Sequence, residues 1–382
     1  MKVEELALQR KRYAHLTDEE WRWMLQQVEG RERTRDKLPT MAKIDDWWYP
    51  VRLSCEQCSS EQTARWKSEK VMKQKGDVAR RVLVDLTGGY GVDTYFMSEH
   101  FAEAHYVEQN EELCRIAKHN FAFNHPQIQV HNTCAEDFLR ELNDKVQVIY
   151  LDPARRDKNG GKVFRIEDCE PNVVSLLPTL VSKADRIIIK LSPMLDITAA
   201  LRSLQIPMDV DIVAVNNEVK EVLLWSKTKQ GSSRINAVNL GSHVTEWSFV
   251  QEEEKNAQCM LWDTKRGDQL VEGMYIYEPN AAILKAGAYK LVGARYGLLK
   301  WEQNTHLYLS LKYVEHFPGR VWKLRNILKK DMKDIRASVM TRNYPLTSDQ
   351  LRKKLKAKEG DAMTIIGARL GDKPIVVLAE KC

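Results

Sequence analysis

The chain passes from an apolar run into a glycine-rich turn at Val84-Asp85-Leu86-Thr87-Gly88-Gly89-Tyr90-Gly91-Val92-Asp93-Thr94. The run Val82–Leu86 predicts a short buried strand, and a helical stretch follows the turn. Glycines at 88, 89 and 91 allow the backbone to turn tightly and to pass close to a ligand. A strand, a glycine loop and a helix in this order predict a binding site at the carboxyl end of the strand, where Thr87 would also lie.

The acidic residue that ends this strand indicates which kind of ligand the loop takes. A dinucleotide site holds a pyrophosphate with G-x-G-x-x-G, whereas the spacing here is G-G-x-G. The Asp85 carboxylate would repel a pyrophosphate and would suit a ligand with a positive ammonium group. Glu108 ends the next strand candidate, His105–Val107, where a carboxylate can accept hydrogen bonds from both ribose hydroxyls. The alternative is that Asp85 caps the helix and Glu108 is a surface acid, but both acids at strand ends favour ligand binding.

Strand and helix signals alternate from Arg81 onward. Further buried-strand candidates are Ile128–His131, Val146–Leu151, Ile187–Leu191 and Val210–Val215, with a last one at Val219–Trp225, and Glu111–Phe123 has helical periodicity. This rhythm is typical of a parallel sheet covered by helices on both faces. The sequence therefore predicts an α/β fold with a Rossmann-like, doubly wound sheet.

Two acids follow the third strand candidate. Glu136 and Asp137 would lie beside an adenine in this layout, where a carboxylate can accept a hydrogen bond from the exocyclic amine. Acidic residues also favour the first turn of a helix. Both interpretations stay open.

A buried strand runs directly into Asp152-Pro153-Ala154-Arg155-Arg156. Asp152 is expected to face the same cleft as Asp85 and Glu108, because ligands bind beyond the carboxyl ends of parallel strands. Pro153 fixes the chain direction, and Arg155 lies where it could bind a substrate phosphate. The alternative for the arginines is pairing with nearby acids.

The rest of the chain divides into regions that differ in composition and in residue pattern. We expect a helical N-terminal region (1–80), the sheet domain (81–250), a small α+β domain with a ferredoxin-like fold as one option (259–317), and a basic C-terminal domain (318–382). Thr17 and Glu20 predict a capping box at a helix start, and a second helix is expected from about Glu56 to Val71. Residues 251–258 are polar and predict a linker. The chain is expected to end in a basic helical part and a hairpin formed by 363–370 and 375–380.

Composition limits the class of protein. With 382 residues, 43% hydrophobic and 29% charged, the chain predicts a soluble protein of two or three domains. No apolar run approaches the roughly 18–20 residues that span a bilayer, and the first twelve residues show no secretory signal. Seven scattered cysteines favour free thiols in the cytoplasm. The lone pair Cys55-x-x-Cys58 lacks a second pair at zinc spacing, so no metal is expected.

The positive charge of the chain is unevenly distributed. The net charge is +6, and residues 320–358 hold thirteen Lys and Arg but only three acidic residues. Such a block can bind an anionic polymer, or it can be a solvated face. The densest part contains Arg352, Lys353, Lys354, Lys356 and Lys358, which are the candidate RNA-binding residues.

Taken in order, the glycine loop, the acids after the second and third strands and Asp152-Pro153 after the fourth resemble the class I methyltransferase family over roughly residues 55–230. The resemblance implies S-adenosyl-L-methionine as the cofactor and Asp152 as the residue that orients or deprotonates an acceptor amine. The segment 53–60 is similar to a Glu-Gln-x-x-Thr element of some nucleic-acid amino-methyltransferases, which places cofactor contacts on Gln57 and Ser60. An ordinary helix start is the alternative there. The whole layout looks like that of bacterial members with a THUMP-like C-terminal domain, a type of domain that accompanies RNA-modifying enzymes.

The sequence also departs from that family. Arg155 stands where an aromatic could stack on a flipped base, and Leu191-Ser192-Pro193 offers no cysteine nucleophile for carbon-5 chemistry. The resemblance favours methylation of structured RNA, transfer or ribosomal. A small-molecule or protein methyltransferase and a non-catalytic RNA-binding protein with a vestigial cofactor site remain alternatives.

Overall fold

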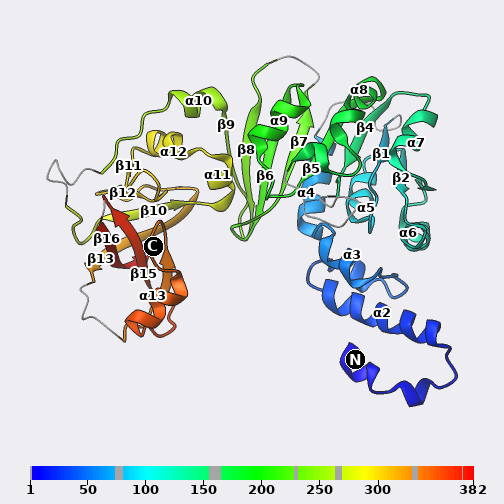
Figure 1. The fold of residues 1–382 in the computed structure, drawn as a ribbon, viewed down its shortest axis with the longest axis horizontal. Helices are drawn as coiled ribbons and strands as arrows, with labels where there is room; N and C mark the ends of the chain where they lie inside the picture. Colours follow the sequence, from blue (N-terminus) through cyan, green and yellow to red (C-terminus); the bar gives the residue numbers. More distant parts are fainter. Residues whose placement is uncertain are drawn as a thin grey trace. The chain divides into compact units, whose positions relative to one another are not determined.

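The computed structural model describes residues 2–73, 81–154, 165–227, 231–262, 269–328, 334–371 and 373–382. The chain forms two compact units, one of Met1–Val210 with Lys220–Gly231 and one of Asp211–Val219 with Ser232–Cys382. Figure 1 shows the order of the elements along the chain.

The first unit begins with helices. These are α1 (Val3–Ala7), α2 (Asp18–Thr34), α3 (Arg52–Gln57) and α4 (Glu61–Met72), with 3-10 turns at Arg10–Tyr13 and Met41–Lys43. The predicted capping box is confirmed, because Thr17 Oγ1 accepts from the Glu20 N–H and the Glu20 carboxylate accepts from the Thr17 N–H. The helix expected from about Glu56 to Val71 is α4, which begins later than expected, because α3 ends at Gln57 and Ser60 caps α4.

The sheet of the first unit has the predicted doubly wound topology. Its strands lie in the order β3-β2-β1-β4-β5-β7. Strands β1 to β5 pair in parallel, and β7 is antiparallel to β5. The strands are β1 (Val82–Asp85), β2 (Glu103–Glu108), β3 (Ile128–Asn132), β4 (Val146–Leu151), β5 (Ala184–Leu191) and β7 (Glu218–Ser226). The strand order reverses direction between β1 and β4, so right-handed crossovers place helices on both faces and open a crevice at the reversal.

Helices connect successive strands of this sheet (Figure 1). They are α5 (Val92–Ser98), α6 (Glu111–Asn124), α7 (Ala135–Glu141), α8 (Val173–Lys183) and α9 (Ile197–Leu204), with a 3-10 turn at Ile166–Asp168. Strand β4 is buried along nearly its whole length, as expected for a central strand covered on both faces. Strand β6 (Met208–Val215) follows α9, beginning in the first unit and ending in the second.

The second unit contains the β8 (Arg234–Leu240) and β9 (Thr245–Val250) hairpin and a separate sheet in the order β11-β12-β10-β13-β16-β15-β14. Those strands are β10 (Tyr275–Pro279), β11 (Leu299–Lys300), β12 (Tyr308–Ser310), β13 (Gly319–Ile327), β14 (Ser338–Thr341), β15 (Met363–Leu370) and β16 (Lys373–Lys381). Its helices are α10 (Gln251–Asn256), α11 (Ala281–Ala286), α12 (Tyr289–Tyr296) and α13 (Ser348–Leu355). The antiparallel β15–β16 pair confirms the predicted terminal hairpin.

One expectation for the second unit is wrong. The polar stretch predicted as a linker contains helix α10, whose Glu253 binds Arg295 at 2.7 Å and whose Glu254 accepts from the backbone of α12. The basic helical part expected within 318–382 is α13, and Gly319–Ile327 forms strand β13. At α10, contacts with α12 override the local polar pattern.

Candidate functional site

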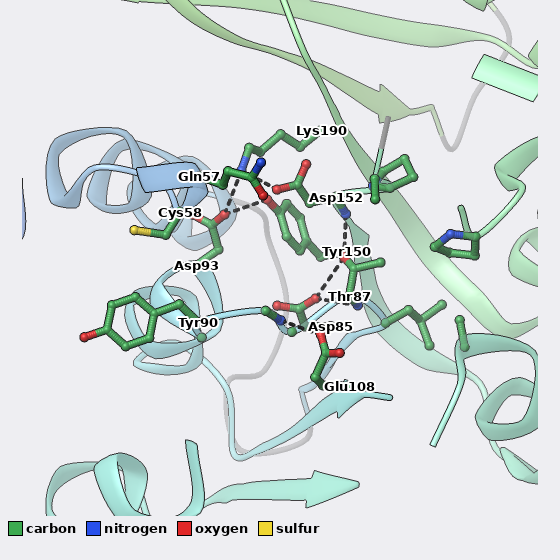
Figure 2. A pocket seen from close by; sticks show the side chains of 18 of the residues that line it. Gln57, Cys58, Asp85, Thr87, Tyr90, Asp93, Glu108, Tyr150, Asp152 and Lys190 are labelled. Atoms are coloured by element: carbon green, nitrogen blue, oxygen red, sulfur yellow. Dashed lines mark hydrogen bonds and ion pairs between the residues drawn. The ribbon is translucent and has the colours of Figure 1, made fainter. Parts of the chain in front are cut away.

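A cavity of about 930 Å³ opens at the carboxyl ends of the strands of the first unit (Figure 2). This volume is within the range of ligand pockets. Its lining includes ten of the residues named from the sequence, namely Gln57, Asp85, Thr87, Gly88, Gly89, Gly91, Glu108, Glu136, Asp152 and Pro153. The convergence follows from parallel strands ending at one edge of a sheet.

The glycine loop has the backbone conformation that its sequence allows. Gly89 and Gly91 have φ angles of +55° and +83°, in the left-handed region. A Cβ at Gly88 would lie 2.2 Å from the Tyr106 ring, and one at Gly91 would lie 2.6 Å from Phe121. The glycines therefore let the loop pack directly on β2 and α6, which sets the floor of the cavity.

Asp85 is buried at the end of β1, and each of its oxygens accepts a hydrogen bond. Its Oδ1 accepts from the Thr87 N–H at 3.0 Å, and its Oδ2 accepts from the Thr94 hydroxyl at 2.5 Å. Burial raises the pKa of Asp85 to about 7, with the hydrogen bonds from Thr94 and Thr87 opposing this shift. The carboxyl group therefore changes charge near neutral pH, and a nearby ligand ammonium would favour its ionised form.

Glu108 lies at the end of β2, half-buried against the loop. Its Oε2 accepts from the Gly89 N–H at 2.9 Å and its Oε1 accepts from the Asn110 N–H at 2.8 Å. Two backbone donors thus fix both oxygens, and each carboxylate oxygen keeps capacity for a further donor. This geometry suits a pair of vicinal hydroxyls, such as those of a ribose.

Asp152 follows β4 and faces the same cavity. Its backbone N–H donates to the Thr87 hydroxyl at 2.5 Å, which joins the exit of β4 to the glycine loop. Its Oδ2 lies 2.5 Å from the Nζ of Lys190 on β5. Figure 2 shows Asp152 with Lys190 on one side of the cavity and Glu108 with Asp85 on the other.

The sequence pattern did not single out the buried polar residues next to Asp152. Lys190 Nζ lies 3.1 Å from Ser59 Oγ and 3.6 Å from Asp93 Oδ2, and Lys67 Nζ lies 3.1 Å from Asp93 Oδ1. The Asp93 carboxylate also accepts from Tyr150 at 2.7 Å. The one local signal was a lysine inside the apolar run Ile187-Ile188-Ile189-Lys190-Leu191, since a charged residue is rarely buried without a partner.

The remaining predicted residues lie elsewhere. Ser60 is outside the cavity lining, and its side chain accepts from the Thr63 N–H as the cap of α4. Asp137 is also outside the lining and pairs with Arg140 on the surface of α7, whereas Glu136 lines the cavity. Arg155 lies outside the described residues.

The basic residues named from the sequence belong to the second unit. Arg352, Lys353 and Lys354 lie in the last turn of α13, which buries Leu351 and Leu355 against the core. Lys353, Lys354, Lys356 and Lys358 are exposed, while Arg352 is half-buried and pairs with Glu359 at 3.5 Å. The end of α13 and the residues after it therefore present lysines to solvent.

The two cysteines of the Cys-x-x-Cys pair are reduced and pack inside the first unit. Cys55 and Cys58 are both free, and Cys58 Sγ donates to the Cys55 carbonyl. Burial raises the pKa of Cys55 to about 12, so a thiolate ligand is disfavoured there. The described ranges contain no group of three or more His, Cys, Asp or Glu side chains that could hold a metal ion. In the same part of the chain, each helix is too short or too polar to cross a membrane.

Three acidic side chains of the cavity suit a nucleoside that also carries an ammonium group. Glu108 offers a fixed carboxylate for hydroxyls, Glu136 a carboxylate for an amine, and Asp85 an acid that ionises near neutral pH. S-adenosyl-L-methionine has all three partner groups. The residues present therefore fit this cofactor.

Comparisons with known proteins agree with this geometry. A ferredoxin-like domain model matches residues 275–318, and a THUMP domain-like model matches residues 311–381. A crystal structure of a protein assigned as a methyltransferase from Porphyromonas gingivalis W83 has 32% sequence identity to this chain. The match covers 96% of this chain and 92% of that chain, with a TM-score of 0.82. This chain is 22% identical over 366 residues to an uncharacterized S-adenosylmethionine-dependent methyltransferase of Mycobacterium tuberculosis, covering 91% of this chain and 93% of the relative.

Proposed function

Because the chain belongs to the class I S-adenosylmethionine-dependent methyltransferases with a THUMP-like C-terminal domain, we propose that it methylates a nucleotide in structured RNA. The observation that carries the choice of RNA is the THUMP-like match at 311–381 together with the exposed lysines of and after α13. Lysines on one exposed face suit a phosphate backbone. Transfer and ribosomal RNA both have the required structure.

The bound cofactor supplies an electrophilic methyl group on a sulfonium. We assign its binding to residues of the cavity: Glu108 holds the ribose hydroxyls, Asp85 faces the ammonium, and Glu136 lies on the adenine side. Thr87 and the glycine loop form the surface between them, and Gln57 closes the wall from α3. Holding the cofactor at several points directs its methyl group toward one side of the cavity.

We assign the acceptor side to Asp152 and Pro153. The Asp152 carboxylate can accept a hydrogen bond from an acceptor amine and orient its lone pair toward the methyl group. Pro153, Pro171 and Pro193 also line the cavity, and the apolar faces of their rings can contact a planar base. Such contacts would compensate for the missing aromatic side chain after Asp152.

The test is methyl transfer from labelled S-adenosyl-L-methionine to RNA taken from a strain that lacks this gene, followed by nucleoside analysis. We expect one labelled nucleoside with that RNA and none with RNA from the parent strain, whose sites are already methylated. The Asp152→Ala protein is the matched control, because it should bind cofactor and fail to transfer. Transfer of label to a metabolite or protein extract, but not to RNA, would show that RNA is not the substrate and that a small molecule or a protein is. Tight cofactor binding without transfer to any pool would mean a binding protein.

A further inference from the structure

A line of alternating charges leads from the interior of the first unit to Asp152. Glu221 on β7 pairs with Lys67 on α4 at 2.6 Å, and Lys67 pairs with Asp93 on α5 at 3.1 Å. Asp93 lies 3.6 Å from Lys190 on β5, and Lys190 lies 2.5 Å from Asp152 after β4. The five side chains come from five separate elements, so their positions are fixed only in the folded protein.

Glu221 is 3% exposed, and from Lys67 outward the exposure of the side chains rises along the line. It is 0% for Lys67, 9% for Asp93, 12% for Lys190 and 38% for Asp152. The inner charges are therefore locked in place by burial and pairing, while the outermost carboxylate reaches the cavity. A fixed interior with one exposed end is the arrangement that holds a reactive group in a single orientation.

Lys190 is the member that touches Asp152. Its Nζ contacts Ser59 Oγ at 3.1 Å and Asp152 Oδ2 at 2.5 Å, with Asp93 Oδ2 at 3.6 Å. An ammonium has three donors, and these contacts leave it little freedom to rotate away. Burial alone would lower the pKa of Lys190, but the charges of Asp152, Asp93 and Glu221 outweigh this and raise it, so the ammonium is retained.

We propose that Lys190 is a positioning residue for methyl transfer: its ammonium holds Oδ2 of Asp152 and turns Oδ1 toward the acceptor. The role in transfer rests on the proposed function, whereas the pairing with Asp152 does not. An acceptor N–H then meets a carboxylate oxygen whose orientation is already set. Without Lys190 the carboxylate can rotate about its side-chain bonds, and misplacement of a catalytic group by about 1 Å can cost on the order of 100-fold in rate.

The chain offers a matched control for this ion pair. Lys145, just before β4, pairs with Asp185 on β5 at 2.8 Å, with both side chains more than half exposed. This pair lies at the amino ends of β4 and β5, next to the paired residues Val146 and Ala184, whereas the cavity is at the carboxyl ends of the same strands. Lys145→Met therefore removes a Lys–Asp pair between the same strands without touching the site.

The experiment compares Lys190→Met with Lys145→Met in the full chain. In protein labelled with [4-¹³C]aspartate, the Asp152 carboxyl signal is the one that disappears in Asp152→Asn. We expect this signal to move in Lys190→Met and to stay in place in Lys145→Met. With undermethylated RNA, we expect Lys190→Met to lower kcat about 100-fold with little change in KM for RNA, and calorimetry should show S-adenosylhomocysteine binding close to wild type.

The readouts separate this inference from the choice of substrate. An unmoved Asp152 signal in folded Lys190→Met protein, checked by circular dichroism, overturns the positioning role whatever the substrate is. A moved signal with wild-type kcat on RNA also overturns it. If the wild-type protein transfers no methyl group to RNA, the proposed function fails, and the carboxyl signal still decides whether Lys190 sets the position of Asp152.

Discussion

The Gly89 backbone N–H donates a hydrogen bond to Oε2 of Glu108 over 2.9 Å. The glycine loop after β1 therefore holds the acid at the end of β2 before any ligand arrives. Because the donor is a backbone N–H, its position is fixed by the loop. Pre-organised contacts of this kind reduce the ordering cost of binding.

Glu108→Gln should weaken S-adenosylhomocysteine binding by about 1–3 kcal/mol, the usual cost of removing a charged hydrogen-bond partner. Glutamine keeps one acceptor oxygen for the loop but presents an amide donor to the second hydroxyl. Calorimetric titration measures the change. Glu112→Gln, on the exposed face of α6, is the control and should bind normally. Wild-type affinity in both Glu108→Gln and Asp85→Ala would refute the assignment of the cofactor site.

Cofactor affinity should depend on pH through Asp85. Burial raises the pKa of Asp85 to about 7 from its ordinary 3.8. A ligand ammonium favours the ionised form, so binding releases a proton when the free protein is protonated. Affinity should therefore fall as the pH drops below about 7, by up to about tenfold per pH unit. Asp85→Asn should bind more weakly and show a flat profile between about pH 6 and 8, which a titration series can check.

The raised pKa of Asp85 also predicts how the free energy of unfolding changes with pH. Between about pH 4 and 7 the unfolded chain ionises Asp85 while the folded chain keeps the proton. This group therefore lowers the free energy of unfolding as the pH rises through that window, and its contribution levels off above about 7. Comparing wild-type and Asp85→Asn in urea at about pH 5 and pH 8 isolates the effect. The decrease in stability on going to the higher pH should be smaller in Asp85→Asn, and an equal decrease in the two proteins would contradict the shift.

Asp152→Ala should lose most methyl transfer while retaining cofactor affinity within a few-fold. The reason is that Asp152 lies on the proposed acceptor side of the cavity, whereas the groups proposed to hold the cofactor are on α3, β1, the glycine loop, β2 and α7. Single-turnover transfer and calorimetry on the same preparation measure both quantities. Wild-type turnover in Asp152→Ala would mean that the carboxylate has only a structural role.

Lys67→Met should destabilise the first unit by about 3–5 kcal/mol, because it leaves the carboxylate of Glu221 buried without its ammonium partner. The double variant Lys67→Met/Glu221→Leu should recover much of this stability, since it removes both charges. Urea unfolding followed by tryptophan fluorescence measures the two values. A destabilisation of the double variant equal to the sum for the two single variants would argue against the pairing.

Binding to RNA should depend on the lysines of the second unit. Truncation after residue 317 would delete β13, β14, β15 and β16 from their sheet, so substitution is the cleaner change. Replacing Lys353, Lys354, Lys356 and Lys358 with Gln should weaken RNA binding. The salt dependence should become shallower by about 0.7–0.9 log units for each phosphate that the protein no longer neutralises.

The control for that variant carries the same reduction in charge in the first unit, at Lys11, Lys43, Lys118 and Lys145, which are also exposed. Filter binding at several salt concentrations compares the two proteins. Cofactor affinity should be unchanged in the variant of the second unit. An unchanged RNA affinity and salt slope there would mean that these lysines are a solvated face.

The local pattern of the sequence was enough to predict the sheet and one edge of the site. Asp85, Glu108 and Asp152 each end a run of apolar residues, and the rule that parallel strands end at one edge brings them together without further information. The glycine loop is equally local, because a left-handed φ at Gly89 and Gly91 follows from residue type and turn position. Where local signals misled, as in the polar stretch that forms α10, contacts with α12 decided the outcome.

Only the tertiary structure decided which charges surround Asp152. Lys67 and Glu221 are separated by 154 positions, and Lys190 and Ser59 by 131. Strand and helix periodicity indicates which face of an element is buried but not which buried charge meets which. A lysine in an apolar strand is tolerated only where folding places carboxylates around it, because an unpaired charge costs several kcal/mol in the interior. The sequence by itself therefore determined the frame of the cofactor site, and the packing of five separate elements determined the line of charges that ends at Asp152.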